Sequence, residues 1–177
     1  MPLGPGGTPL LTATLEVLAP LADPILVSAR EPGELASFGR PIVLDRRQGV
    51  GPLGALEAVL EASPHERVLV VACDMPFLSR RLLDRLVTLS HEHAGASAVV
   101  PRTAAGLHPL HAVYTRSLLP EIRERLERGA LALHELLSAM SAFEVAEDEL
   151  RRYDPTLRSL ENVNTPEDLA HARETRP

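Results

Sequence analysis

Short apolar runs alternate along this chain with segments whose apolar residues recur at helical spacing, and this alternation restricts the chain to the α/β class. The apolar runs, which we expect to be strands, cover residues 24–29, 41–45, 67–74, 96–101 and 111–114, and we expect one more short strand inside 159–164. The helical segments cover residues 8–21, 53–62, 78–93, 116–129 and 132–140, and one more follows Thr165. Strands without polar alternation are typical of sheets buried on both faces. We therefore predict a single domain over residues 1–177 with three layers, in which a mainly parallel sheet lies between two layers of helices.

The composition argues against nucleic-acid and membrane partners. The chain has 177 residues, a formal net charge of −6 and no tryptophan, whereas nucleic-acid surfaces are basic and single strands stack on aromatic rings. No apolar stretch is long enough to span a bilayer, and the first residues do not resemble a secretory signal. The one cysteine, Cys73, lies in an apolar run and is expected to be a buried thiol. These features favour a cytoplasmic protein.

Two of the predicted strands end in an acid. The run from Val68 to Cys73 is followed by Asp74, and the run over residues 41–45 ends at Asp45. A carboxylate at the edge of a core loses hydration, so it needs a compensating partner. At the carboxyl ends of strands in an α/β sheet such a group can hold Mg²⁺ with phosphate oxygens, or it can cap the turn that follows. Position alone leaves both interpretations open.

Other motifs are ambiguous when taken singly. The glycine-rich turn over residues 49–54 could lie against a ligand or form a plain loop, and Asn162 and Asn164 could contact a ligand or cap a helix. The histidine pairs at 91/93 and 108/111 do not predict zinc, because no cysteine or acid completes a tetrahedral set. All eighteen basic residues are arginines, so no reaction step can use a lysine of this chain.

Four segments in this order resemble the molybdenum cofactor guanylyltransferases (MobA type): IVLDRRQGVGPLGAL (42–56), VLVVACDMPFL (68–78), HPLHAVY (108–114) and ENVNTPEDL (161–169). The resemblance runs from about residue 2 to residue 170 and implies a Rossmann-like nucleotidyltransferase fold. It also implies roles for particular residues. Asp74 would be the catalytic acid and Mg²⁺ ligand, and Asp45 would contact the guanosine of GTP. The turn residues Gly51, Pro52 and Leu53 would border the nucleotide and pterin groove, and Asn162 and Asn164 would lie on the molybdopterin side.

The chemistry implied by the resemblance is nucleotidyl transfer with GTP and molybdopterin as substrates, Mg²⁺ as cofactor and, as possible partners, cofactor-handling proteins. A phosphate of molybdopterin attacks the α-phosphorus of GTP and pyrophosphate leaves. Two alternatives remain. The chain could be a non-catalytic remnant that binds cofactor or docks a partner, or it could transfer another nucleotide, as the related molybdopterin cytidylyltransferases and sugar-phosphate nucleotidyltransferases do.

The chain departs from the family pattern at its start. Members begin with a strand and a loop of the form L-A-G-G-x-S-x-R-M-G-x-D-K, whereas MPLGPGGTPLL (1–11) corresponds to the stretch after that loop. We expect the strand, the loop and its lysine to be encoded upstream of residue 1, and without that strand two strand edges should face a gap. Two smaller departures are Ala55, where members carry glycine, and Arg30, where they often carry asparagine.

Overall fold

The computed structural model describes residues 10–31, 35–47, 49–163, 165 and 168. The helices are α1 (Leu10–Leu18), α2 (Gly51–Ala62), α3 (Arg80–Glu92), α4 (Leu119–Glu127), α5 (Leu133–Ala139) and α6 (Glu147–Arg151). The strands are β1 (Val27–Ala29), β2 (Ile42–Leu44), β3 (Arg67–Val71), β4 (Ala98–Thr103), β5 (Gly106–Leu107), β6 (His111–Thr115) and β7 (Ala142–Val145). The predicted cap at Thr8 lies outside the described residues.

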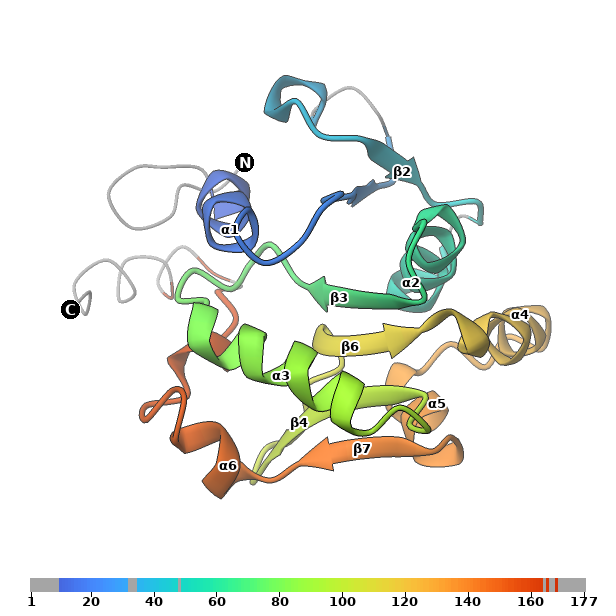
Figure 1. Ribbon diagram of the computed structural model, residues 1–177. Coiled ribbons are helices and arrows are strands. Elements are labelled where there is room, and N and C mark those ends of the chain that lie inside the picture. The colour runs from blue at the N-terminus through green and yellow to red at the C-terminus, as the bar shows by residue number, and fades with distance from the viewer. Residues whose placement is uncertain (1–9, 32–34, 48, 164, 166–167, 169–177) are drawn as a thin grey trace.

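The strands form two separate sheets (Figure 1). One is the parallel pair of β1 and β2. The other has the order β3-β6-β4-β5, with β7 pairing parallel to β4. The prediction of an α/β fold with helices on both faces is confirmed, but the sheet is mixed rather than mainly parallel. Strand β6 runs antiparallel to β3 and to β4, because the connection from β4 is too short for the crossover that parallel strands need.

Alternate residues of the larger sheet pack against different helices. Ala112 and Tyr114 of β6 face a cluster built with side chains of α2, α4 and α5. Val113 faces the opposite cluster, which includes side chains of α3 and the α6 residue Leu150, and Figure 1 shows α3 lying in front of this sheet. Since both faces of the sheet are covered, the three-layer prediction is confirmed.

Helix α3 shows how local sequence places one of these layers. Ser79 is its N-cap, and the Ser79 hydroxyl accepts a hydrogen bond from the backbone N–H of Leu82 at 3.3 Å. The residues that recur at helical spacing on its inner face are buried, namely Leu82, Leu83, Leu86 and Leu89. The cap therefore determines the residue at which the loop after β3 ends and α3 begins.

A gap separates β1 from β3. The backbone N–H of Ala72 donates to the carbonyl oxygen of Leu110, which continues the pairing of β3 with β6. The even-numbered residues of β3 therefore form the hydrogen bonds to β6, and the backbone N–H and C=O groups of Leu69 and Val71 point to the opposite side. A cavity of about 1030 Å³ occupies the space, lined by β3, β1 and apolar side chains of α1. The segment before β1 and the segment before β3 are in contact at one edge of this gap, where His65 Nε2 lies 3.0 Å from the carbonyl oxygen of Asp23. The predicted pair of strand edges facing a gap is thus present.

Three local expectations differ from the structure. Cys73 is exposed rather than buried, because β3 ends at Val71 and the chain has already turned. The segment after residue 158 forms a 3-10 turn, Arg158–Leu160, and residues 161–163 are not in a strand. Strand β7 and helix α6 were not predicted, since each is only a few residues long.

Candidate functional site

Asp74 lies in the turn between β3 and α3, on the wall of the large cavity. Its side chain is half-buried, and its Oδ1 is fully shielded from solvent without a hydrogen-bond partner among the described residues. A buried carboxylate oxygen normally has a donor or a cation beside it. Asp74 does not use this oxygen to cap its own turn, so the capping interpretation loses support.

The turn that carries Asp74 is tied to the C-terminal part of the chain. The backbone N–H of Val163 donates to the carbonyl oxygen of Asp74 at 2.8 Å. Asn162, which precedes Val163, is exposed. The structure therefore brings residues 161–163 against the Asp74 turn, and Asn164 lies outside the described residues.

Asp45 follows β2 and lines the same cavity. Its Oδ1 accepts a hydrogen bond from the Ser28 hydroxyl at 3.0 Å, and its backbone N–H donates to the carbonyl oxygen of Ala29 at 3.2 Å. Ser28 was not predicted, because a serine inside a short strand gives no signal until the strand's neighbour is known. Its hydrogen bond orients the Asp45 carboxylate and leaves the second oxygen available.

The glycine turn leads directly into α2. Gly51 is the first residue of that helix and has φ +62°, a left-handed conformation that strains any residue with a Cβ. Gly51 and Pro52 line the cavity, whereas Leu53 is fully buried in the core and does not. Leu53 therefore anchors the turn by packing in the core, and the structure does not bring it to the cavity where the resemblance implies a border of the groove.

The sequence analysis also did not predict a role for Asp154, which holds together the turn that precedes Val163. This buried carboxylate accepts hydrogen bonds from the Thr156 hydroxyl at 3.1 Å and from the backbone N–H of Ser159 at 2.9 Å. The Asp-Pro-Thr sequence is the available signal, because aspartate before proline is typical of turns. The folded turn replaces the strand that was expected there.

His111 of β6 is buried near this turn. It has no exposed surface, and neither ring nitrogen has a partner among the described residues. The pKa of His111 is lowered to about 3, mainly by burial and also by the nearby His108, while Asp154 opposes the change. His111 is therefore neutral at pH 7 and belongs to the core that supports the site.

The residues at this site suit a divalent cation that is bound jointly by a protein carboxylate and by oxygen atoms of the ligand. They suit less well a cation that is bound by protein side chains alone. In the described part of the chain, no three His, Cys, Asp or Glu side chains gather as a metal cage. Mg²⁺ commonly takes one or two carboxylates and completes its shell with phosphate oxygens and water. The unpartnered oxygen of Asp74 suits that arrangement.

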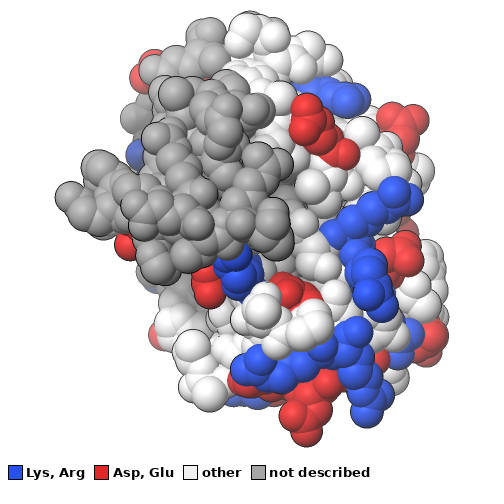
Figure 2. Space-filling view, turned by 90° about the vertical axis from the view of Figure 1, so that its left-hand side faces the viewer, with Lys and Arg blue, Asp and Glu red and all other residues white. Residues whose placement is uncertain are grey.

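Charges of both signs lie on the described part of the face toward which β3 points (Figure 2). Figure 2 views the molecule from the side toward which β3 points, and on the described part of this face acidic and arginine side chains are interleaved. Ion pairs on α6 contribute to this pattern, with Arg151 to Glu147 at 2.7 Å and Arg152 to Glu149 at 2.9 Å. Over its described residues, the chain also has no helix of the length and apolarity that crossing a membrane requires.

Comparison with known proteins gives consistent matches. A family model described as a MobA-like NTP transferase domain matches residues 1–144. A probable molybdenum cofactor guanylyltransferase of Methanosarcina mazei is 32% identical over 93% of this chain and 80% of the relative. A probable molybdenum cofactor guanylyltransferase of Chloroflexus aggregans is 31% identical over 94% of this chain and 80% of the relative.

Solved structures agree with these matches. Molybdopterin-guanine dinucleotide biosynthesis protein A from Archaeoglobus fulgidus has a TM-score of 0.84 and 26% identity, covering 97% of this chain and 87% of that protein. The 2-C-methyl-D-erythritol 4-phosphate cytidylyltransferase of Thermus thermophilus has a TM-score of 0.66 at 20% identity, covering 98% of this chain and 90% of that protein. At that identity the second match speaks for the fold alone.

Proposed function

Because this chain belongs to the MobA-like NTP transferase family, a family of nucleotidyltransferases, we propose that it joins GMP from GTP to molybdopterin and so makes the guanylylated molybdenum cofactor. The observation that carries the proposal is the placement of Asp74. Asp74 lines a cavity that Asp45 and the Gly51 turn also line, and its shielded Oδ1 has no hydrogen-bond partner among the described residues. The same cavity therefore offers a carboxylate for a cation and a carboxylate for a nucleoside.

In the proposed reaction a phosphate oxygen of molybdopterin forms a bond to the α-phosphorus of GTP. The bond from that phosphorus to the bridging oxygen breaks, and pyrophosphate leaves with the bonding electrons. Because the acceptor is itself the nucleophile, the protein needs no serine or cysteine nucleophile. Its contribution is to position the two anions and to hold the charge that neutralises them.

Nucleotidyltransferases commonly use a divalent metal, and we propose that Mg²⁺ serves here with Asp74 as its protein ligand. The ion supplies positive charge beside the phosphates. Asp74 fixes where that charge lies, and the hydrogen bond from Val163 to the Asp74 carbonyl oxygen holds the turn in place. The supporting feature is the shielded Oδ1, whose desolvation a cation would offset.

The other proposed contacts divide between the two substrates. Asp45, oriented by Ser28, would accept hydrogen bonds from the guanosine part of GTP. Gly51 and Pro52, at the start of α2, would lie against the nucleotide. The buried Leu53 would keep this turn in place by packing in the core. Asn162 and Asn164 would contact molybdopterin beside the Asp74 turn. The proposal includes a cytoplasmic location, which the composition favours, and cofactor-handling proteins as partners.

The test is pyrophosphate release from GTP in the presence of Mg²⁺ and molybdopterin. Two proteins are compared: residues 1–177, and a form extended at the amino end by a strand and a glycine-rich loop with a lysine. We expect release to depend on molybdopterin and on the cation, and to be faster in the extended form, because the strand would fill the gap between β1 and β3.

The same assay separates the alternatives. CTP in place of GTP identifies a cytidylyltransferase if it reacts faster than GTP. A non-catalytic protein would bind nucleotide or molybdopterin yet release no pyrophosphate in either form. Absence of release in both forms, with all substrates present, contradicts the proposed activity.

A further inference from the structure

We propose that Arg30 binds the phosphates of the nucleotide in this site, as the cation placed beside Asp45 at the ends of β1 and β2. This inference rests on the proposed function, since it assigns a residue to the nucleotide of that reaction.

The register of the first sheet places Arg30 next to Asp45. Ala29 of β1 pairs with Leu44 of β2 in a parallel ladder, and Arg30 and Asp45 are the residues that follow them. Neighbouring strands lie about 4.8 Å apart, so the two backbones leave the sheet side by side. Arg30 is exposed and lines the same cavity as Asp74. A ligand held by Asp45 is therefore within reach of a long arginine side chain.

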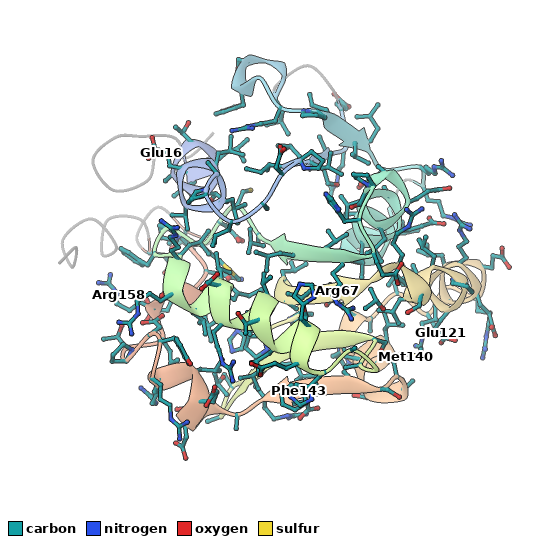
Figure 3. The ribbon with its side chains drawn as sticks, in the orientation of Figure 1. Glu16, Arg67, Glu121, Met140, Phe143 and Arg158 are labelled. Atoms are coloured by element: carbon teal, nitrogen blue, oxygen red, sulfur yellow. The ribbon has the colours of Figure 1, made fainter. Side chains whose placement is uncertain are left out.

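Arg30 is also the cation that remains available on the cavity wall. Of the residues that line the cavity, Arg30 and Arg67 are the basic ones other than histidine. Arg67, which is labelled in Figure 3, is the first residue of β3, whereas Asp74 follows the other end of that strand. The Nη2 of Arg67 donates to the carbonyl oxygen of Ala94 at 3.4 Å. Arg30 makes no ion pair with any residue that the structure describes.

The arginines of the loop after β2 are engaged elsewhere. Arg46 pairs with Glu61 at 2.8 Å, and Arg47 lies 3.7 Å from Glu57, both acids of α2. These contacts direct two nearby positive charges toward the helix rather than toward the cavity. Arg30 is left as the arginine beside Asp45 that can turn to a ligand.

The charges of the site require such a residue. A nucleoside triphosphate brings several negative charges to a cavity that already holds the carboxylates of Asp45 and Asp74. The chain contains no lysine, so any cationic side chain that it supplies to the phosphates is an arginine. The guanidinium group suits this task, because its planar set of N–H donors matches phosphate oxygens two at a time.

The experiment measures binding of GTP with Mg²⁺, and of guanosine by competition, to the whole chain and to its variants. For Arg30→Gln we expect GTP affinity to fall by about 10- to 100-fold, the usual effect of losing hydrogen bonds to a charged group. Guanosine affinity should be unchanged, because guanosine has no phosphate. Arg30→Lys should recover part of the lost GTP affinity, because lysine restores the positive charge but not the planar set of N–H donors.

Arg40→Gln is the matched control. Arg40 precedes β2, at the other end of the same sheet, and does not line the cavity. The same charge change there should leave GTP affinity unaltered. Thermal unfolding of each variant verifies that the fold persists.

The outcomes separate this inference from the proposed function. If the unaltered chain binds GTP and Arg30→Gln binds it equally well, Arg30 is not a phosphate contact and the proposed function stands. An equal loss of GTP and guanosine also overturns the inference, because it shows general damage to the site. If the unaltered chain binds no GTP, the same variants are measured in the form extended at the amino end, and absence of GTP binding in both forms contradicts the proposed function and this inference with it.

Discussion

The backbone N–H of Val163 donates a hydrogen bond of 2.8 Å to the carbonyl oxygen of Asp74, which joins the C-terminal segment to the turn after β3. Asn162 is carried with Val163 to the same turn. The proposed metal ligand and the proposed molybdopterin contact are therefore positioned by one interaction of the main chain. A change of side chain at Asp74 leaves that interaction in place, so chemistry and folding can be tested separately.

Replacing Asp74 by asparagine should abolish most of the turnover while the fold persists. The amide keeps the shape of the side chain but cannot hold a cation as a carboxylate does, and losing one stabilising charge commonly costs about 10²- to 10³-fold in rate. The measurement is pyrophosphate release across a Mg²⁺ titration, with thermal unfolding alongside. Asp84→Asn, an exposed acid on α3, is the control. Full activity of Asp74→Asn would refute the metal role.

Ser28→Ala should weaken the binding of GTP without removing activity. The substitution deletes the 3.0 Å hydrogen bond to Asp45 Oδ1, which frees the carboxylate to rotate and costs about 1 kcal/mol of stability. We expect KM for GTP to rise while kcat changes little. Ser138→Ala, on the exposed face of α5, should alter neither constant. A fall in kcat at constant KM would argue that Asp45 acts on the reacting phosphates instead.

Glu57→Gln should destabilise the protein by about 1–3 kcal/mol. The Glu57 side chain is only 5% exposed and receives Arg123 at 3.2 Å and Arg47 at 3.7 Å, so neutralising it leaves two arginines without their shared acid. Urea unfolding measures the change. The exposed pair of Glu124 and Arg128 provides the comparison, because Glu124→Gln should cost less than about 1 kcal/mol. Equal costs for the two variants would contradict this account.

His111 should make stability fall at acid pH. Its pKa is about 3 in the folded protein against an ordinary value of 6.5, so the unfolded chain binds the proton more readily throughout that interval. The stabilisation is complete above pH 6.5 and is lost as the pH falls, by about 1.4 kcal/mol per pH unit until the folded pKa is approached. The measurement is the free energy of unfolding between pH 7 and pH 4.

His111→Leu should flatten this pH dependence, because the buried side chain no longer titrates. His91→Gln, at an exposed position near the end of α3, should leave the slope unchanged. If His111→Leu keeps the slope of the unaltered protein, other groups cause the loss of stability in acid.

Much of the architecture follows from local patterns. The apolar run before Asp74 and the one before Asp45 predict strands, and both acids come to the cavity wall after their strands. The burial predicted for these strands is wrong, because β3 faces the gap and is half-buried, and β2 ends at the exposed Leu44. The helical spacing of leucines in α3 and the serine before it also predict that element correctly. These features depend on periodicity and capping, which neighbouring residues determine.

Other features depend on contacts that no local pattern reveals. The direction of β6 follows from the short path between β4 and β6, and the hydrogen bond from Ser28 to Asp45 exists because β1 and β2 pair in one register. Asp154 accepts a hydrogen bond from the backbone N–H of Ser159 and so holds its segment in a turn, in place of the short strand that was expected there. Each depends on partners distant in sequence or on a side chain that competes with the backbone.

The break between β1 and β3 has a dynamic consequence. Among the described strands, no ladder of hydrogen bonds joins the two sheets, so β1 and β2 can open as a cooperative unit while β3, β6 and β4 stay closed. Amide protons that bond within the pair, such as those of Val27 and Asp45, would then exchange with deuterated water sooner than those of the larger sheet. The nucleoside end of the cavity would be the less rigid one, and a bound nucleotide would slow that exchange.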